Sequence, residues 1–456
     1  MRPHPDPPTA LPARATARSG ADAEIEQEIL RRFRTLPGDR LALLFRAAAL
    51  ASEVGCGLYW VGGGVRDLWL GASELDLDLV VEGDLAAFAR RFAEDLGTGL
   101  HLHPQFMTAE LLAPGGLRVD LARARSEIYP SPASLPVVTP GTMASDFERR
   151  DFTINCLAIP LAPVFGECLI DPGAGLRDLA QRRLRILHPT SFRDDPTRIL
   201  RGLEFAARFG FDLAPETLQE AERAIAGGVV ALLSPARLGA ALGRALGRTA
   251  SAAKVLRSLD ELGLLTAIDA CLAGTAAGTS PGNHPAAARF ETALAASAAG
   301  RPTAAFRLAL LCLTLDLGSA ERARVARRLD LTLADRELVI AGPERVRQAL
   351  AVLGGEPQPS TVHAGLGALS GEELALVAAQ GASARAWVQR ECAELRSVRL
   401  TIGGRDLLAA GLAPGPVLGR ALEATLAAKL DGRIGDAGEL AFALRAAALG
   451  AGESRS

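Results

Sequence analysis

The sequence predicts an α+β head followed by an all-helical remainder, and two patterns along the chain support this. From Gly57 to about Leu187, short apolar strand-like segments alternate with glycine turns and helical segments. From residue 194 to 450, Ala, Leu, Arg and Glu recur at helical spacing with almost no β-branched alternation. The chain has 456 residues, of which 49% are hydrophobic, so it can bury cores in more than one compact unit. We expect about two to four domains.

Each expected element of the head has its own local pattern. Short apolar runs predict strands, glycines mark the turns, and apolar residues at helical spacing predict helices. The expected elements are a strand at 58–61, a helix at 65–70, a strand at 75–81, a helix at 84–96, and β-rich stretches near 107–112 and 117–122. Later in the chain, the Gly- and Pro-rich segments 271–285 and 353–360 are expected to be loops between helices.

Composition argues against several classes of protein. Apolar segments fall well short of the roughly 18 residues that span a bilayer, so we expect no membrane partner. The six cysteines form no C-x-x-C pair, which argues against a zinc site or a disulfide framework and favours a reducing cytoplasm. The net charge is −2, so any nucleic acid must be held by a local basic surface.

The first 24 residues differ from the rest of the chain. They are rich in Pro, Ala and Arg and lack the apolar core of a secretory signal. We expect residues 1–24 to be a disordered N-terminal extension, with an organelle transit peptide as the alternative.

Two carboxylates lie one residue apart on the expected strand at 75–81. On a strand, Leu75, Leu77 and Leu79 point into the core, while Asp76 and Asp78 share the opposite face with Cα atoms about 6.5 Å apart. Carboxylates at this range repel each other unless a cation lies between them. The pair therefore predicts a metal site, with an exposed strand face as the alternative.

The strand follows a run of glycines in "VGGGVRD", residues 61–67. A corner of this kind, between a strand and a helix, presents backbone N–H groups and a helix N-terminus that can bind phosphate. The run lacks the G-x-G-x-x-G pattern, so it gives little support to a dinucleotide site.

The stretch from Val61 to Val80 resembles the signature of class II nucleotidyltransferases, the family of tRNA CCA-adding enzymes and bacterial poly(A) polymerases. Further motifs follow in the order that the family has them. They are "DFERRDFTINCLAI" (146–159), similar to R-R-D-x-x-x-N; "DPGAGLRDLAQRRLR" (171–185), similar to D-x-x-x-G-x-x-D-L; "DDPTRILRGLEFAARFGF" (194–211), similar to E-D-x-x-R; and a C-terminal segment at 404–422. The resemblance spans roughly residues 40 to 440, and four ordered motifs make a chance match improbable.

The resemblance implies how the chain is divided. It implies a polymerase-β-like nucleotidyltransferase head with a mixed sheet at 25–187 and a helical neck with a base-reading motif at 188–250. The helical body and tail, 251–456, would bind RNA. We see no internal repeat of fixed period.

The resemblance also implies catalytic roles for three aspartates. Asp76 and Asp78 would hold Mg²⁺ ions, which would activate the RNA 3′-hydroxyl and steady the leaving pyrophosphate. Asp120, on a later strand, falls where a third acidic residue belongs; an ordinary aspartate at a strand edge is the alternative.

Further residues are implied to contact the triphosphate and the ribose. Asn155 could equally be fixed by a structural hydrogen bond, because its segment is otherwise apolar. Asp67 could simply complement the helix dipole. The third motif, with Asp171 and Asp178, is interpreted as structural. The implied nucleotide contacts are Gly62, Gly63, Arg66, Arg150, Asp151, Asn155 and Arg201.

The fourth motif is expected to select the base. Cytosine and adenine each present an NH₂ donor beside a ring-nitrogen acceptor, so an Asp that accepts and an Arg that donates would match them and reject uracil and guanine. Asp195 and Arg198, at i and i+3 of one expected helix, would form this pair; a surface ion pair is the alternative. Asp194 stands where the family usually has Glu, which puts its support of Arg198 in doubt.

The sequence therefore predicts an RNA nucleotidyltransferase that adds C and A to tRNA 3′ ends from CTP and ATP. The segment 120–149 leaves room for a mobile loop that would switch specificity from CTP to ATP. The alternatives are an enzyme that adds only CC or only A, a poly(A) polymerase, an inactive RNA-binding module, and an enzyme that modifies small molecules. We expect no DNA partner. Basic patches that could hold the tRNA, or be ordinary solvated helix faces, comprise Arg182, Arg183, Arg185, Arg322, Arg324, Arg327 and Arg328.

Overall fold

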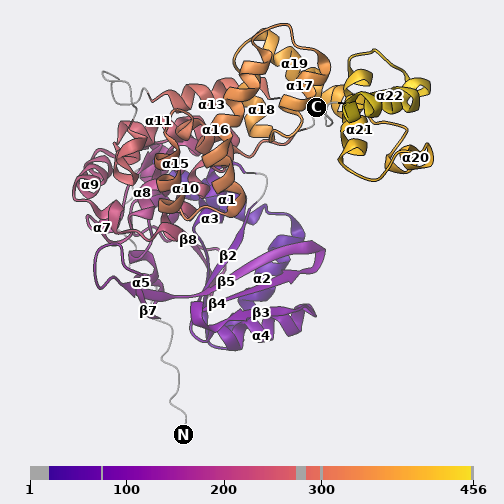
Figure 1. The fold of residues 1–456 in the computed structure, drawn as a ribbon. Coiled ribbons are helices and arrows are strands. Elements are labelled where there is room, and N and C mark those ends of the chain that lie inside the picture. The colour runs from indigo at the N-terminus through magenta and orange to yellow at the C-terminus, as the bar shows by residue number, and fades with distance from the viewer. Residues whose placement is uncertain (1–19, 73–74, 274–283, 298–300, 453–456) are drawn as a thin grey trace. The chain divides into compact units, whose positions relative to one another are not determined.

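The computed structural model describes residues 20–72, 75–273, 284–297 and 301–452 (Figure 1). The chain forms two compact units that divide between Ser234 and Pro235. This division falls inside the segment 188–250 that we expected to be a neck. Most of the expected N-terminal extension lies outside the described residues, but helix α1 begins at Gly20, so extending the disordered segment to residue 24 was wrong.

The first unit is built on a six-stranded sheet of order β3-β4-β5-β2-β1-β8. The central pair, β2 and β5, is parallel, and the other neighbours are antiparallel, which confirms the predicted mixed sheet. The strands are β1 (Gly57–Val61), β2 (Leu77–Glu82), β3 (Leu100–His103), β4 (Thr108–Ala113), β5 (Leu117–Arg123) and β8 (Ala158–Ala162).

The helices around the sheet begin and end where the sequence provides caps. Helix α4 starts after Asp84, whose side chain accepts a hydrogen bond from the Ala87 amide, and it ends at Gly97 in the left-handed conformation. The expected helices at 65–70 and 84–96 are confirmed, although α3 starts at Gly63. The helices before residue 190 are α1 (Gly20–Arg34), α2 (Gly38–Glu53), α3 (Gly63–Leu70), α4 (Leu85–Leu96), α5 (Met143–Glu148) and α6 (Gly175–Ala180).

The segment expected to be a mobile loop, 120–149, contains regular structure. Strands β6 (Arg125–Ile128) and β7 (Val137–Pro140) pair as an antiparallel hairpin, with Ile128 opposite Val137. Helix α5 follows and starts with a capping box between Thr142 and Ser145. Residues 120–149 thus form a hairpin and a helix, which the Pro and Ser content of the segment did not indicate.

The first unit ends in helices that follow the head sheet. Strand β9 (Arg183–Leu184) comes before two of these helices in the sequence and β10 (Asp212–Leu213) comes after them. The two strands pair as a two-stranded parallel sheet. The helices are α7 (Ser191–Asp194), α8 (Thr197–Phe209) and α9 (Pro215–Ala226), and the single-turn 3₁₀ helices of the unit are η1 (Pro104–Phe106), η2 (Pro114–Gly116), η3 (Thr153–Asn155) and η4 (Val229–Leu232).

The described part of the second unit is helical, as predicted. Helix α16 ends at Leu353 and α17 begins at Pro359, so the expected loop at 353–360 is confirmed, whereas most of 271–285 lies outside the described residues. The α-helices are α10 (Pro235–Leu246), α11 (Thr249–Glu261), α12 (Leu264–Ile268), α13 (Pro285–Ala296), α14 (Ala305–Thr314), α15 (Ser319–Arg328), α16 (Leu333–Leu353), α17 (Pro359–Leu366), α18 (Gly371–Ala378), α19 (Ala382–Ala393), α20 (Gly404–Ala409), α21 (Pro416–Leu430) and α22 (Glu439–Gly452). The 3₁₀ helices are η5 (Ala270–Leu272), η6 (Leu395–Ser397) and η7 (Asp436–Gly438).

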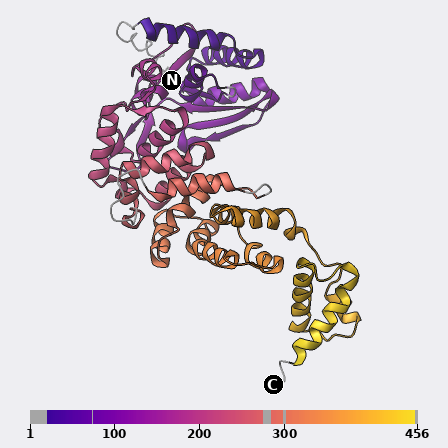
Figure 2. The same ribbon diagram turned by 90° about the horizontal axis from the view of Figure 1, so that it is seen from above.

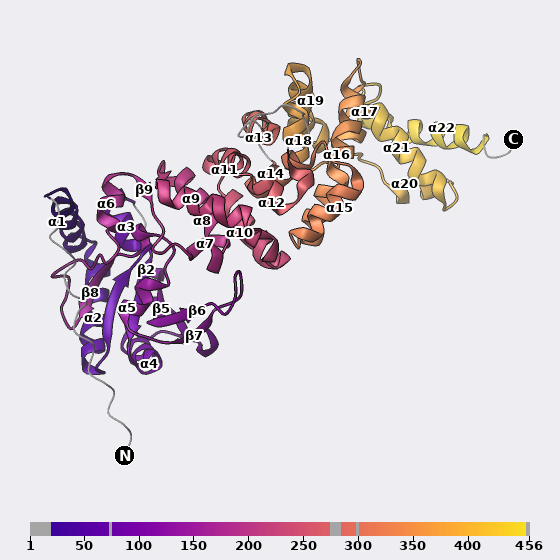
Figure 3. The same ribbon diagram turned by 90° about the vertical axis from the view of Figure 1, so that its left-hand side faces the viewer.

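The C-terminal helices have a small core of their own. Helices α20, α21 and α22 lie side by side at the yellow, C-terminal end of the chain (Figures 2 and 3). Leu407 of α20, Ala421 of α21, and Ala443 and Ala447 of α22 form a buried apolar cluster. Within the described residues, no helix has the combination of length and apolar character needed to cross a bilayer.

Candidate active site

The paired aspartates lie at the start of β2. Leu75, Leu77 and Leu79 are buried, as the strand pattern predicts. Asp78 lies on the opposite face of the strand. Val80, on the same face as Asp78, packs in a buried cluster with Met143 and Phe147 of α5. Asp76 is exposed and precedes the strand, because β2 begins at Leu77 and not at residue 75. The strand therefore presents Asp78 at the edge of a packed core.

Asp120 joins this pair from the neighbouring strand. In the parallel register of β2 and β5, Asp120 lies directly opposite Asp78. Burial, and then the negative charges of Asp120 and Asp76, raise the pKa of Asp78 from its ordinary value of 3.8 to about 6. The structure thus brings the three predicted acids together, with Asp78 at their centre.

The donor set fits a divalent cation such as Mg²⁺. Carboxylate oxygens are the ligands that hard cations prefer, and a bound cation would offset both the burial and the neighbouring charges that raise the Asp78 pKa. Asp120 accepts a hydrogen bond from Arg118 Nε at 2.9 Å. In the described ranges, no group of three His, Cys, Asp or Glu side chains is positioned to hold a metal ion.

The glycine corner between β1 and α3 has a conformation that explains its first glycine. Gly62 has φ of 66°, the left-handed region that favours glycine, and its amide donates to the Leu157 carbonyl at 3.0 Å. A Cβ atom there would lie 3.1 Å from Arg150 Nη1. The corner therefore places an arginine of the second motif directly beside the N-terminus of α3, where Gly63 is the first residue.

Arg66 lies inside the protein. Its side chain is 4% exposed; Nε donates to Asp67 at 2.8 Å and Nη1 to Asn155 Oδ1 at 2.5 Å. The guanidinium carbon also lies 4.6 Å from the centroid of the Phe209 ring. Burial lowers the pKa of Arg66 from its ordinary value. Its contact with a triphosphate stays a prediction, and Asp67 is the ion-pair partner of Arg66.

Asp151 connects the second motif to helix α8. One carboxylate oxygen accepts from Asn155 Nδ2 at 2.9 Å, and the other pairs with Arg201 Nε at 2.6 Å. Because Asn155 also accepts from Arg66, a chain of contacts runs from α3 through Asp151 to α8. The structural hydrogen bond considered for Asn155 is therefore present, and its contact with a nucleotide stays a prediction.

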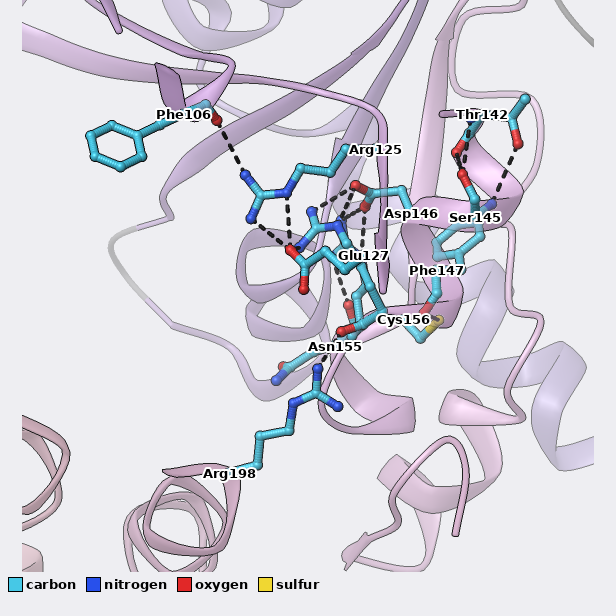
Figure 4. A network of polar contacts seen from close by, with 12 residues as sticks. Phe106, Arg125, Glu127, Thr142, Ser145, Asp146, Phe147, Asn155, Cys156 and Arg198 are labelled. Carbon is cyan, nitrogen blue, oxygen red and sulfur yellow. Dashed lines mark hydrogen bonds and ion pairs between the residues drawn. The ribbon is translucent and has the colours of Figure 1, made fainter. Parts of the chain in front are cut away.

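A buried carboxylate that the sequence analysis missed holds both motif arginines. Asp146 is fully buried and pairs with Arg149 at 2.6 Å and with Arg150 at 2.9 Å (Figure 4). Arg149 also lies 3.5 Å from Glu127 of the β6–β7 hairpin. The i,i+3 and i,i+4 spacing in "DFERR" could have indicated this arrangement. Cys156, in the same motif, is fully buried.

Arg198 reaches from α8 into the same network (Figure 4). It is 6% exposed and donates to Ser191 Oγ and to the Arg149 carbonyl, both at 2.7 Å. Its remaining acceptor is the Tyr129 hydroxyl at 3.4 Å, on the segment that joins β6 to β7. These partners are uncharged oxygens, so the positive charge of Arg198 remains available to a ligand group.

Two aspartates precede Arg198, and the structure corrects the predicted placement of one of them, Asp195. Asp195 and Arg198 do not lie on one helix, because α8 begins at Thr197 and the Asp195 carboxylate accepts from its amide at 3.1 Å. Asp194 accepts from the Thr190 hydroxyl at 2.8 Å, while Ser191 and Arg149 hold Arg198.

The third motif is structural, as predicted. Asp171 accepts from the amides of Gly175 and Leu176 at the start of α6. Asp178 is fully buried and accepts from the Thr153 hydroxyl at 2.6 Å and from Arg185. This motif therefore joins α6 to the second motif.

The arginines expected to hold RNA differ in exposure and in their partners within the protein. Arg185 is paired with Asp178 and Glu216, whereas Arg182 and Arg183 are exposed. On α15, Arg322 is 5% exposed and Arg324 forms two hydrogen bonds with Asp269, at 2.8 and 2.9 Å. Arg327 is exposed and Arg328 is half-buried. Successive helix residues differ by about 100°, so Arg324, Arg327 and Arg328 share one side of α15, from which Arg322 points away. A contact of these arginines with RNA stays a prediction.

Comparison with known proteins supports the resemblance. Residues 58–185 match the family described as the poly A polymerase head domain. An A-adding tRNA nucleotidyltransferase of Halalkalibacterium halodurans is 42% identical over 183 residues, which cover 40% of this chain and 43% of that protein. The chain spans less than half the length of the A-adding relatives that it matches.

Other relatives match over most of their length. A CC-adding tRNA nucleotidyltransferase of Deinococcus radiodurans is 33% identical over 395 residues, which cover 85% of this chain and 88% of that protein. The solved structure of the Thermotoga maritima CCA-adding enzyme complexed with tRNA is 27% identical with a TM-score of 0.72 and covers 92% of this chain and 97% of that chain. This chain therefore belongs to the class II nucleotidyltransferase family of CCA-adding enzymes and bacterial poly(A) polymerases.

Proposed function

We propose that this protein transfers C and A nucleotides from CTP and ATP to the 3′ end of tRNA, completing CCA with release of pyrophosphate. The observation that carries this proposal is the juxtaposition of Asp78 on β2 and Asp120 on β5, with Asp76 beside them. The glycine corner at the start of α3 precedes these aspartates in the sequence. Relatives that match most of this chain are named for nucleotide addition to tRNA.

Asp76 and Asp78 would hold Mg²⁺, with Asp120 as the third acid. When bound, the metal supplies positive charge that activates the RNA hydroxyl and stabilises the leaving phosphate oxygens. The chain's own contribution is to keep the carboxylates close together at the end of a rigid strand. Asp120 would turn from Arg118 to the metal, since a divalent cation attracts a carboxylate more strongly than one exposed guanidinium does.

The triphosphate would lie along the glycine corner and the arginines beside it. Gly63 would present its backbone amide at the start of α3, while Gly62, whose amide is bonded to the Leu157 carbonyl, would let the phosphate approach the turn closely. Arg150 is held there by Asp146. Arg66, Asp151, Asn155 and Arg201 form the connected chain of contacts behind this position. In our proposal this chain fixes the distance between the corner and helix α8.

Base selection would come from the end of the same network. Arg198 is fixed by uncharged acceptors, so it can donate to a ring nitrogen without first losing an ion pair. Asp195 would accept from the exocyclic amino group, and Asp194 would support the turn through Thr190. The tRNA phosphates would contact exposed arginines, with Arg182, Arg183 and Arg327 as the candidates.

A second candidate is addition of the terminal A alone. It is favoured by two relatives named A-adding, which are 42% identical over 183 residues and 44% identical over 167 residues. Addition of CC alone is the activity for which the Deinococcus relative is named. A poly(A) polymerase would not require a tRNA as acceptor. An inactive RNA-binding module would retain the fold without the carboxylates.

The deciding experiment supplies purified protein with three tRNA substrates, ending before CCA, after the first C, or after CC. Each is incubated with CTP, ATP or both, and product lengths are read on a sequencing gel. Extension of the first substrate to CCA supports the proposal. A stop at CC, or activity only on the substrate that already ends in CC, would replace it with a split-function enzyme.

A further inference from the structure

We infer that Trp60, supported by the N-terminal helix α1, positions the catalytic aspartate Asp76; this rests on the proposed function. Asp76 precedes β2, so the ladder of backbone hydrogen bonds that fixes Asp78 does not extend to it. The Trp60 indole Nε1 donates to the Asp76 carbonyl at 3.0 Å. Trp60 is fully buried in β1, so this bond connects an exposed catalytic residue to the rigid core.

The first turn of α3 closes around this hydrogen bond. At Gly64, a Cβ atom would lie 2.5 Å from the Asp76 carbonyl oxygen and 2.5 Å from Trp60 Nε1. Only a glycine lets the helix approach so closely. The glycine corner, the indole and the Asp76 backbone therefore meet at one point, and the distance between a phosphate-binding corner and a metal ligand is set there.

Helix α1 supports the indole from the other side. Phe33 is 1% exposed, and its ring centroid lies 5.9 Å from that of Trp60. The adjacent Arg32 donates to the Leu68 carbonyl at 2.7 Å and to the Trp69 carbonyl at 3.2 Å, at the end of α3. One helix thus fixes both the indole and the far end of α3.

This helix lies outside the residues that match the family's head domain, 58–185. Its contacts with Trp60 and α3 nevertheless place it behind the glycine corner. We assign α1 to the scaffold of the active site.

A merely structural role for Trp60 would be to satisfy its own buried N–H. Both roles predict that loss of the indole lowers stability, so stability alone does not separate them. A positioning role also predicts weaker metal binding, because a loosened Asp76 must be ordered again when the cation binds. Metal affinity is therefore the informative readout.

The test is Trp60→Phe, which keeps an aromatic ring against Phe33 and removes the N–H donor. Mn²⁺ binding is measured by electron paramagnetic resonance of the free ion, beside the Mn²⁺ concentration for half-maximal nucleotide transfer. We expect both to weaken about three- to tenfold, the size of one lost hydrogen bond. Trp387→Phe, the same exchange in the second unit, is the matched control and should change neither.

A folded Trp60→Phe protein with wild-type Mn²⁺ affinity would overturn the inference. If Trp60→Phe does not fold, Gly64→Ala displaces the Asp76 carbonyl from the opposite side, and unchanged Mn²⁺ affinity in that variant would overturn it equally. Failure of the proposed function has a different signature, because the wild-type protein would then transfer no nucleotide at all.

Discussion

The first unit and helix α15 both carry arginines that the sequence led us to expect at the nucleotide or at the RNA, and their partners within the protein differ. Arg66, Arg150 and Arg198 of the first unit each have at least two defined acceptors within the protein. On α15, Arg322 is buried with unpartnered Nε and Nη1 atoms, while Arg327 is exposed. The motif arginines are therefore fixed by several contacts inside the protein, whereas Arg324 and Arg327 keep exposed side chains on one side of α15.

The difference has a physical cause. In the first unit, Arg66 donates to Asn155 and Arg198 donates to the Arg149 carbonyl, so contacts between residues far apart in the sequence fix these two side chains. On α15, Arg324 has one such partner, Asp269, and Arg327 is exposed. We therefore expect large functional effects from the head and small, separable effects from α15.

The largest effect is expected for Asp78→Ala. It should abolish nucleotide transfer, because it removes the central carboxylate of the three, while tRNA binding and folding persist. Transfer is measured with labelled CTP, and folding by circular dichroism. Glu94→Ala, which removes an exposed carboxylate on helix α4, is the control. Retained activity in Asp78→Ala would contradict the metal assignment.

The next largest effect is expected for Arg198→Ala. It should relax discrimination of C and A against U and G by roughly one to two powers of ten, the usual size of a bidentate base contact. Single-nucleotide incorporation with all four triphosphates measures this. Arg208→Ala, on the same helix, is the control. Unchanged selectivity with a loss of stability would show that Arg198 only holds Ser191 and the Arg149 carbonyl together.

A smaller effect on stability follows from the raised pKa of Asp78. The folded state holds this proton more tightly than the unfolded chain, so the metal-free protein should lose stability as pH rises from about 4 through 6. Asp78→Asn should therefore be more stable than wild type by about 1–3 kcal/mol at pH 7.5 without metal, and no more stable at pH 4. Urea unfolding at both pH values tests this; equal stabilities at pH 7.5 would contradict the carboxylate repulsion.

The smallest effects are expected on α15. Arg327→Ala should reduce the slope of log K against log salt for tRNA binding by less than about 0.9 and leave stability unchanged. Arg324→Ala should instead lower stability through loss of its pair with Asp269. If Arg327→Ala leaves the salt dependence unaltered, the tRNA does not contact this helix, and Arg182 and Arg183 are tested next.

Much of the head could be predicted from local pattern. The alternation around Asp76 and Asp78 placed Leu77 and Leu79 in the core, and Gly and Asp residues marked the ends of α4. The helical unit was evident from composition. The β6–β7 hairpin was missed because its exposed Ile128 and Val137 carry no inward-facing apolar pattern.

The contacts that join the motifs could not be predicted in the same way. Asp146 is buried and paired with Arg149 and Arg150, and Arg149 in turn contacts Glu127 and, through its carbonyl, Arg198. Asp195 precedes α8, where its carboxylate accepts hydrogen bonds from the Thr197 amide and hydroxyl. Local sequence identified the chemistry of these residues, and long-range packing decided their partners.

In our proposal, Asp195 and Arg198 select C and A, and the acceptor is a tRNA. The most direct measurement incubates wild-type protein and Mg²⁺ with each of the four labelled triphosphates, using either tRNA that lacks its 3′ CCA or an unstructured RNA of equal length. We predict transfer of CMP and AMP to the tRNA, little UMP or GMP, and little transfer to the unstructured RNA. Equal AMP transfer to both RNAs, or no transfer to tRNA from any triphosphate, would contradict it.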